Sequence, residues 1–497
     1  MKIGRLVLVI MLVGLGASAA QAQDGAPVGQ FVPSPCPFEL PDDLIDGENV
    51  ICGTLTVPQF HAEPARGTLT IGVSVIKSPN PAAEPSPLFI NTGGPGGSTA
   101  LESMDLFALG ISDSILAQRD IVLMEVRGTR YTEPFLFCEP LYEQVLASDS
   151  AIGALLDAAQ TCQAEWEAKG VDLDAFNSLE IVADMALTIE ALGYDTFNYY
   201  GISYGTIFGQ HLLRDHPERV RSVIFDSVSA LEINYVPRVA QNADRLFGLF
   251  FDYCAQDAYC SAAHPDLEAD LVATVERLNA EPYSLPVVDP ETGETRLITL
   301  TGDYLLGNLF NLMYSSEATA IAPDIIGLLA DDDPMGYYVL GVIIPYLEDF
   351  DRNFSTPLAV IVTCAEDGDM QPEEYQFEGL RPYLVEALGE YLTPEDCQAF
   401  DTTPLDDFVD EPVVSDIPAL ILSGEMDPIT PPAWGDAVAQ HLPNSFAFTV
   451  PGAGHGVIVQ GECVTSLITG FLADPAQAPD ASCLDDLGIT FSSIFED

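Results

Sequence analysis

The stretch FNYYGISYGTIFGQ, residues 197–210, is the segment that most restricts the fold of this chain. It places Ser203 between Gly201 and Gly205, directly after an apolar aromatic run and before a helical pattern. In G-x-S-x-G the serine occupies the tip of a sharp turn between a buried strand and a helix, where its hydroxyl is accessible. Glycines are needed on both sides because a Cβ atom there would collide with closely packed backbone. The motif predicts a nucleophilic serine, provided that the rest of the chain supplies a base, an acid and an oxyanion hole.

Strand and helix patterns alternate along this part of the chain. A helical pattern occupies 179–193 and ends on Gly193, a typical helix C-cap. Buried-strand patterns occupy 51–58, 68–79, 87–97 (where the strand runs into a glycine-rich loop), 120–129 and 221–230. This alternation predicts a mostly parallel central sheet covered by helices on both faces, and with the serine turn it predicts the α/β-hydrolase fold.

The pattern changes after about residue 231, where the chain becomes mostly helical and rich in aromatic and acidic residues. Strand patterns resume at 417–432 and 445–456, and a last helix is expected at 463–475. A chain of 497 residues is long enough for a core and a second unit. We therefore predict a hydrolase core formed by residues 23–230 and 411–497, with a helical cap inserted at 231–410.

Among the six histidines, His455 is the candidate general base. It lies in the glycine-rich segment PGAGHGV just after an apolar strand, and ligands of open α/β sheets gather at the carboxyl ends of strands. Asp427, in LSGEMDPITPP after the preceding strand, is the candidate acid, and Glu425 is the nearest alternative. The order Ser203, Asp427, His455 is that of the α/β-hydrolase triad. Thr430 is expected either to hydrogen-bond the Asp427 carboxylate or to cap the following helix.

An oxyanion hole requires two backbone N–H groups directed at the developing negative charge. One is expected from Tyr204, the residue after the nucleophile. The other is expected from Gly93 or Gly94 in TGGPGG, residues 92–97, where glycines let backbone amides approach a substrate closely. A phosphate-binding loop is the alternative for this segment. Because the segment lacks both the G-K-[ST] ending and the G-x-G-x-x-G spacing, we do not expect nucleotide binding.

The amino end has the three parts of a signal peptide. Lys2 and Arg5 precede an apolar run, and Ala20-Gln21-Ala22 forms a small-residue cleavage site. We predict that residues 1–22 are removed and that the protein is exported to the periplasm or the medium; a retained membrane anchor is the alternative. No later segment is long and apolar enough to cross a bilayer, so no membrane insertion is expected after removal.

Ten cysteines follow the leader, and an even count in an exported chain suggests disulfides. No cluster has the spacing of zinc ligands, and we predict neither a metal nor an organic cofactor. Pairing of neighbours in the sequence is the simplest hypothesis: Cys36–Cys52, Cys138–Cys162, Cys254–Cys260, Cys364–Cys397 and Cys463–Cys483.

The chain carries 76 acidic residues against 17 Lys and Arg, a formal charge of −59. Lys77 and Lys169 are the only lysines beyond the leader. This balance argues against nucleic acids and anionic membranes as partners, because both are bound through basic surface. We interpret the excess as a solvated acidic surface suited to a saline habitat; attraction of cationic substrates such as peptide ammonium groups is the alternative.

Several segments together resemble a known family: NTGGPGGS, VRGTRYTEPFLFC, NYYGISYGT, VTCAEDG, LSGEMDPITPP and PGAGHGV. They are similar to the tripeptidyl-aminopeptidase-like branch of the prolyl-iminopeptidase (S33-type) serine peptidases, over nearly the whole chain. The resemblance implies a secreted α/β-hydrolase with a helical cap, with Ser203 as nucleophile, Asp427 as acid and His455 as base. It also implies an exopeptidase that takes one or a few residues from the amino ends of short peptides.

Aminopeptidase action requires a group that recognises the free ammonium, and Glu366 in TCAEDG is the candidate. Two other functions are compatible with the same residues. An exported carboxylesterase would use the same triad without an ammonium pocket, and a non-catalytic binding protein would use only the scaffold. The sequence makes no prediction about the oligomeric state.

Overall fold

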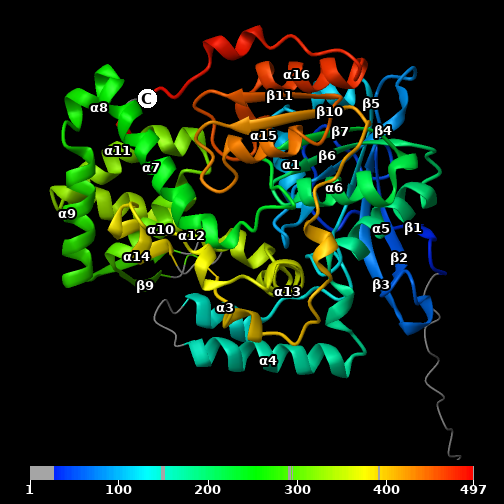
Figure 1. Cartoon of the computed structure of the whole chain (residues 1–497), viewed down its shortest axis with the longest axis horizontal. Helices are drawn as coiled ribbons and strands as arrows, with labels where there is room; N and C mark the ends of the chain where they lie inside the picture. Colours follow the sequence, from blue (N-terminus) through cyan, green and yellow to red (C-terminus); the bar gives the residue numbers. More distant parts are fainter. Residues whose placement is uncertain (1–26, 147–151, 289–292, 294, 390–391, 496–497) are drawn as a thin grey trace, which may run out of the picture.

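A computed structural model of the chain describes residues 27–146, 152–288, 293, 295–389 and 392–495. The predicted signal peptide, residues 1–22, lies outside the described residues. Nine strands form one sheet at one side of the molecule, and a largely helical cap lies beside it (Figure 1). Among the described residues, no helix combines the length and the apolar character needed to span a membrane.

The central sheet has the strand order β1-β2-β3-β5-β4-β6-β7-β10-β11. The first four strands in this order pair antiparallel, and every pair from β5 to β11 is parallel. The sheet is therefore mostly parallel, as the sequence predicts. Its strands are β1 (Phe31–Pro33), β2 (Val50–Pro58), β3 (Thr68–Ile76), β4 (Glu84–Asn91), β5 (Arg119–Met124), β6 (Phe197–Ile202), β7 (Val220–Asp226), β10 (Ala419–Gly424) and β11 (Ser445–Val450).

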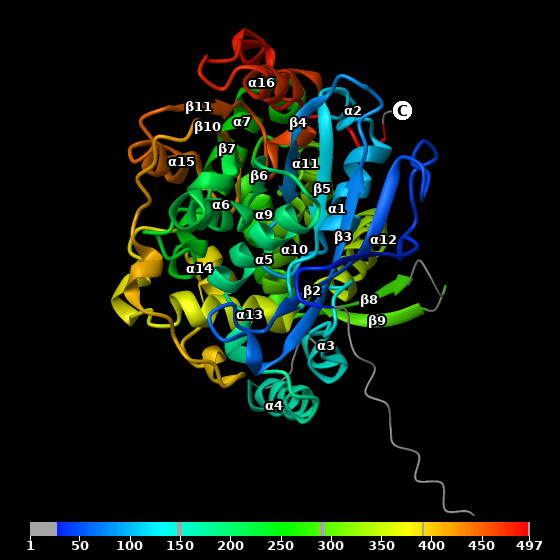
Figure 2. The ribbon, with the colours of Figure 1, turned by 90° about the vertical axis from the view of Figure 1, so that its right-hand side faces the viewer.

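Helices cover both faces of this sheet (Figure 2). Consecutive residues of a strand point to opposite faces, so a strand buried on both sides reads as a continuous apolar run. In β4, Phe89 packs on one face while Leu88 and Ile90 pack on the other. The first face carries α4 (Ile152–Ala168), α5 (Ser178–Ala191), α6 (Gly205–Asp215) and α15 (Pro432–Ala439). The second face carries α1 (Thr99–Ala108), α2 (Asp113–Leu116) and α16 (Glu462–Ala473), while α3 (Glu139–Leu146) lies beside α4.

The cap has an apolar core of its own. Its helices are α7 (Val239–Gln256), α8 (Ala258–Ala263), α9 (Leu267–Ala280), α10 (Gly302–Leu312), α11 (Ser316–Ala330), α12 (Pro334–Asn353) and α14 (Pro382–Leu388). Two features differ from the expectation for 231–410. A two-stranded hairpin, β8 (Tyr283–Val288) with β9 (Thr295–Leu300), lies within the cap. Helix α13 (Thr356–Asp367) packs its buried residues Leu358, Ile361 and Val362 into the apolar cluster of the sheet, so it belongs to the hydrolase core.

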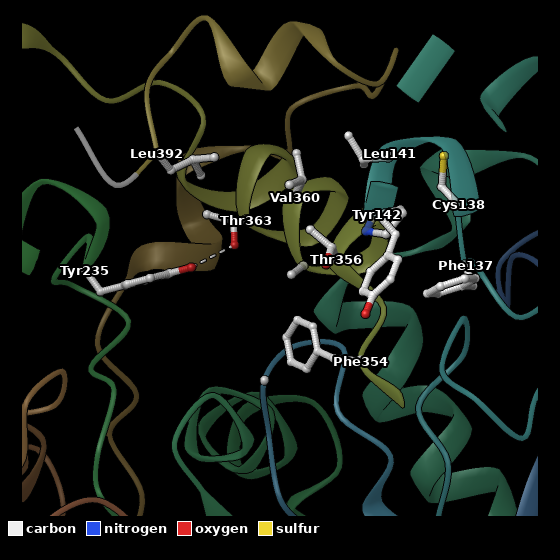
Figure 3. Close-up of a pocket in the computed structure, with 13 residues that line it drawn as sticks. Phe137, Cys138, Leu141, Tyr142, Tyr235, Phe354, Thr356, Val360, Thr363 and Leu392 are labelled. Carbon is white, nitrogen blue, oxygen red and sulfur yellow. Dashed lines mark hydrogen bonds between the residues drawn. The ribbon is translucent and has the colours of Figure 1, made fainter. Parts of the chain in front are cut away.

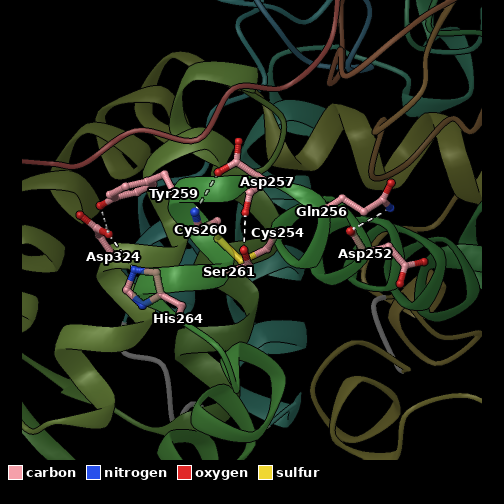
Figure 4. The surroundings of a disulfide bond; sticks show 9 residues. All are labelled: Asp252, Cys254, Gln256, Asp257, Tyr259, Cys260, Ser261, His264 and Asp324. Carbon is pink, nitrogen blue, oxygen red and sulfur yellow. Dashed lines mark hydrogen bonds and ion pairs between the residues drawn. A yellow bond between two sulfur atoms is a disulfide. The ribbon is translucent and has the colours of Figure 1, made fainter.

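Five disulfides join the ten cysteines in the five pairs expected from local spacing. The Cys254–Cys260 bond ties the end of α7 to α8, where the Asp257 carboxylate accepts from Cys260 N at 2.8 Å (Figure 4). In the same region of the cap, His264 Nε2 contacts Asp324 Oδ1 at 2.8 Å.

The carboxyl-terminal segment runs from α16 back to the cap (Figure 1). Phe491 is only 4% exposed and packs in the apolar core of the cap, with its ring 6.0 Å from that of Phe250. Ile494 N and Ser493 Oγ both donate to Asp324 Oδ2 on α11 at 3.1 Å. This last stretch of chain therefore fastens the cap to the core, which the sequence patterns do not indicate.

Candidate active site

Ser203 lies between the end of β6 and the start of α6, as the motif predicts. Its φ angle is +56°, a left-handed conformation that is uncommon for residues other than glycine. A Cβ on Gly201 would lie 2.4 Å from the Gly205 carbonyl oxygen, so only glycine permits this close strand-to-helix turn. Ser203 N donates to the backbone oxygen of Asp226, at the end of the neighbouring strand β7, at 2.9 Å. The turn is thus fixed at the carboxyl edge of the sheet.

Asp427 and His455 meet at the same edge, in the loops after β10 and β11. His455 Nδ1 and Asp427 Oδ2 are 2.9 Å apart, and the Asp427 side chain is fully buried. The other donors to the Asp427 carboxylate are Ile429 N (2.9 Å), Thr430 N (2.8 Å) and Thr430 Oγ1 (2.8 Å). Thr430 Oγ1 also lies 3.3 Å from His455 Nδ1. Of the two alternatives for Thr430, the structure therefore shows the contact with Asp427.

Electrostatics favour the ion pair of these two residues. Burial by itself lowers the pKa of the His455 imidazole, but the charge and hydrogen bond of Asp427, with the charges of Asp226 and Glu102, raise it above 6.5 overall. Burial also raises the pKa of the Asp427 carboxyl, but His455 and the hydrogen bonds to the carboxylate hold it below its ordinary value of 3.8 overall. An acid that stays ionised next to the imidazole stabilises the protonated form that a general base must pass through.

Asp226 joins the serine turn to the histidine loop. Its backbone oxygen accepts from Ser203 N, while its carboxylate accepts from Val457 N at 2.8 Å and Ile458 N at 3.1 Å. The next residue, Ser227, accepts from Gly456 N through its Oγ at 2.8 Å. A Cβ on Gly456 would lie 3.7 Å from Ile202 Cγ2, so the residues next to His455 and Ser203 lie close together. Asp226 was not predicted, although an acid at the end of the strand after the nucleophile was a usable signal.

The cap holds the acid loop and covers the histidine. Arg245 on α7 donates to the backbone oxygen atoms of Glu425 and Asp427. The ring of Tyr314, just after α10, packs edge-on against His455 at 5.0 Å between centroids, and its backbone oxygen accepts from His455 N at 2.9 Å. The cap thus positions the site as well as covering it.

Glu425, the alternative acid, has a different set of partners. Its Oε2 accepts from Tyr253 Oη at 2.5 Å and from Gly452 N at 2.9 Å. It therefore joins the cap to the strand end beside the histidine loop, while Asp427 contacts the imidazole.

The TGGPGG loop lies directly against the serine turn. A Cβ on Gly93 would lie 2.9 Å from Tyr204 N and 2.8 Å from Gly205 N, which explains the need for glycine at this positive φ of 89°. Gly93 differs from the expectation in one respect: its N–H donates to Asn91 Oδ1 at 3.0 Å. Gly94 and Tyr204 are therefore the candidates that remain as oxyanion donors.

Glu102, on α1 just after this loop, is a half-buried acid that was not predicted from the sequence. Desolvation raises the pKa of its carboxyl to about 7, with the charges of Glu125 and Asp105 adding to the increase. A Cβ on Gly97 would lie 2.3 Å from Glu102 Oε1, which places the carboxyl against the glycine loop.

Glu366 is held beside the serine turn by three hydrogen bonds. Its carboxylate accepts from Ser178 N at 2.7 Å, Ser178 Oγ at 2.8 Å and Tyr204 Oη at 2.7 Å, and the residue is 8% exposed. Both oxygen atoms are thus used to hold the start of α5 and the residue after the nucleophile. A role for Glu366 in binding a substrate ammonium stays a prediction.

Two protein families match separate segments of this chain. Residues 86–275 match the family described as alpha/beta hydrolase fold, and this match includes the serine turn. Residues 385–483 match the family described as TAP-like protein, and this match includes Asp427 and His455. The chain has the α/β-hydrolase fold. The fold class and the family resemblance predicted from the motifs are thereby confirmed.

Named relatives of this α/β-hydrolase include peptidases. The serine protease Hip1 of Mycobacterium tuberculosis (strain ATCC 25618 / H37Rv) is 25% identical over 518 residues, covering 96% of this chain and 95% of the relative. The tripeptidyl aminopeptidase of Streptomyces coelicolor is 26% identical over 187 residues, covering 36% of this chain and 35% of the relative. Among solved structures, a proline iminopeptidase from Mycobacterium smegmatis has a TM-score of 0.42 and 16% identity, covering 85% of this chain and 98% of that one.

Proposed function

We propose that this α/β-hydrolase is an exported serine exopeptidase that removes residues from the amino end of short peptides. The fold and the named relatives support a serine hydrolase of the peptidase type. The observation that carries the proposal is the buried Asp427–His455 pair, fixed through Asp226 to the turn that bears Ser203. Five disulfides fit a secreted protein, and they support export to the periplasm or the medium.

In this mechanism Ser203 Oγ attacks the peptide carbonyl carbon while His455 accepts the hydroxyl proton. Because Nδ1 of His455 is held by Asp427, the basic lone pair is on Nε2. The amides of Tyr204 and Gly94 stabilise the oxyanion. His455 then gives the proton to the leaving amine as the C–N bond breaks. Water, activated by the same imidazole, hydrolyses the acyl-enzyme and restores the Ser203 hydroxyl.

The proposal is tested with free and amino-blocked peptide p-nitroanilides and with simple p-nitrophenyl esters. An exopeptidase of this kind hydrolyses the free-amine anilides and discriminates against the blocked ones, and mass spectrometry of peptide products gives the number of residues released. Equal turnover of blocked anilides, or turnover of esters alone, would identify an endopeptidase or a carboxylesterase instead.

Replacement of the nucleophile completes this test. We expect Ser203→Ala to lower kcat/KM at least about 1,000-fold and to abolish labelling by a fluorophosphonate probe. Ser466→Ala, at an exposed serine of α16, is the matched control and should retain full activity. A folded wild-type protein that neither hydrolyses these substrates nor reacts with the probe would favour a binding protein.

A further inference from the structure

An uncharged cavity of about 300 Å³ opens beside the glycine loop (Figure 3). Gly94 forms part of its wall, and most of the remainder is apolar or aromatic, including Phe137, Leu141, Phe354 and Val360. None of the described residues that line it carries a charge. This volume is at the lower end of the range of about 300–1,000 Å³ that is typical of ligand pockets.

The cavity is joined rigidly to the loop that carries the expected oxyanion donor. Ser355 N donates to Gly96 O at 2.9 Å, and a Cβ on Gly94 would lie 3.2 Å from Phe354 Cε2. Helix α13, which starts at Thr356, forms one wall of the cavity and is anchored in the core of the sheet through Leu358 and Ile361. If the carbonyl oxygen of a substrate residue binds at Gly94, the side chain of that same residue can therefore reach this cavity.

The polar atoms at one side of the cavity are already paired. Tyr235 Oη and Thr363 Oγ1 are 3.1 Å apart (Figure 3). Two acidic residues of α1, Glu102 and Asp105, line a separate cavity of about 190 Å³, and Phe354 belongs to the walls of both. This chain has 76 acidic residues, yet the cavity next to the glycine loop is uncharged. Such a cavity distinguishes uncharged from charged substrate side chains. A charged side chain placed there would lose its hydration, and the described residues that line the cavity offer it no opposite charge.

We propose that this cavity binds the side chain of the residue whose carbonyl Ser203 attacks, and that it selects large apolar and aromatic side chains. The inference rests on the proposed peptidase function and specifies its substrate class. A larger apolar side chain fills the cavity and displaces water, and each added methylene in such a pocket is worth about 10-fold or more in kcat/KM. Lysine and aspartate at the same position would be rejected.

The test uses the full-length protein and free-amine p-nitroanilides that differ only at the residue before the anilide: Phe, Leu, Ala, Lys or Asp. Because the number of residues released is unknown, each is made as Xaa, Ala-Xaa and Ala-Ala-Xaa, and the best length is used. We expect kcat/KM for Phe and Leu to exceed that for Ala at least about 10-fold, and that for Lys and Asp by more. A flat series, or a preference for Lys or Asp, would overturn the inference.

A variant that fills the cavity locates the selectivity. Ala359→Trp, on α13, should lower kcat/KM for the Phe substrate at least about 10-fold relative to the Ala substrate. Ala273→Trp, at an exposed helical alanine of α9, should leave the ratio unchanged. Labelling of Ser203 by the fluorophosphonate probe confirms that the variant is folded and reactive. If the Phe to Ala ratio survives in a labelled Ala359→Trp protein, the cavity is not the selective site.

The experiments distinguish a failure of the peptidase function from a failure of the role proposed for the cavity. If no free-amine anilide of any length is hydrolysed, the peptidase function is wrong and the inference falls with it. If the anilides are hydrolysed without regard to the side chain, the peptidase function stands and only the role of the cavity is wrong. The wild-type series decides this second point even if Ala359→Trp does not fold.

Discussion

Three acidic residues raise the pKa of the His455 imidazole. Asp427, Asp226 and Glu102 each raise the pKa of the imidazole, against the effect of burial. Only Asp427 among the three makes a hydrogen bond with the ring. Glu102 acts at longer range, and its own carboxyl has a pKa of about 7, so its charge changes within the range in which such an enzyme would be assayed. The pH profile should therefore depend on an acid that has no part in bond breaking.

Glu102→Gln should shift the acid limb of kcat/KM against pH to lower values. The limb reports deprotonation of the base in the free enzyme, and removal of a negative charge destabilises the imidazolium, so the pKa of His455 falls. Activity on the acid side should rise relative to the plateau. Stopped or continuous anilide assays from pH 5 to 9 measure the shift. Glu165→Gln, at an exposed acid of α4, is the control and should leave the limb in place; an unmoved limb in Glu102→Gln would refute the coupling.

At the level of elements, one buried arginine joins three segments next to the site. Arg127 is fully buried and binds both carboxylate oxygens of Asp184 on α5, at 2.8 and 2.7 Å. It also donates to the backbone oxygen atoms of Gln59 and Ala175, both at 2.6 Å. The neighbouring Glu125 accepts from Ala100 N at 2.9 Å at the start of α1. The segment after β5 therefore holds α1 and α5 in position.

Arg127→Met should destabilise the protein by about 3–5 kcal/mol, because it leaves the buried Asp184 carboxylate with only His61, whose Nε2 lies 2.7 Å from Oδ1. Urea unfolding followed by circular dichroism measures the free energy. Arg66→Met removes an exposed ion pair with Asp172 and should cost less than about 1 kcal/mol. Equal losses in the two variants would show that the buried network contributes no more than a surface pair.

Prediction from the sequence succeeded where a structure is determined by nearby residues. The serine turn was predictable because its glycines, strand and helix lie within a dozen residues, and the disulfides because each closes a short loop. The β8–β9 hairpin was missed, since the alternation in Tyr283–Val288 is weak beside the helical segments around it. The hydrogen bonds of Glu366 were not predictable, because its partners, Ser178 and Tyr204, are more than 160 residues away in the chain. Such contacts depend on the assembled fold and leave no local pattern.

At the scale of the whole molecule, the carboxyl-terminal segment returns to the cap (Figure 1). Phe491 fills a space in the cap although it belongs to the end of the chain, beyond α16. Phe491→Ala should therefore lower the free energy of unfolding by about 3–5 kcal/mol. Phe495→Ala, four residues on and 65% exposed, should change it by less than about 0.5 kcal/mol. Urea unfolding of both variants measures these free energies. Similar losses in the two variants would mean that the segment only lies on the surface of the cap.

The acidic excess acts on the whole molecule as well. The formal charge is −59, and two of the few arginines, Arg119 and Arg127, are buried and neutralise little of the surface. Self-repulsion of this kind destabilises the compact state, in which like charges are closer than in the unfolded chain. The Debye length falls from about 30 Å at 0.01 M salt to about 10 Å at 0.1 M and about 3 Å at 1 M, so added salt relieves the repulsion.

Thermal unfolding should therefore occur at a higher Tm as NaCl increases from 0.01 M to 1 M, with most of the gain at the low end, where the screening length changes most. Loss of exposed ion pairs such as Arg66–Asp172 opposes this gain, but each contributes only about 0–1 kcal/mol. Sucrose at matched osmolality is the control, since it lacks the ionic effect and should not reproduce the rise at low concentration. A Tm that is flat or falls between 0.01 and 0.3 M NaCl would mean that the acidic residues are spaced widely enough not to destabilise the fold at low salt. The interpretation of the acidic surface as a saline adaptation would then lose its physical basis.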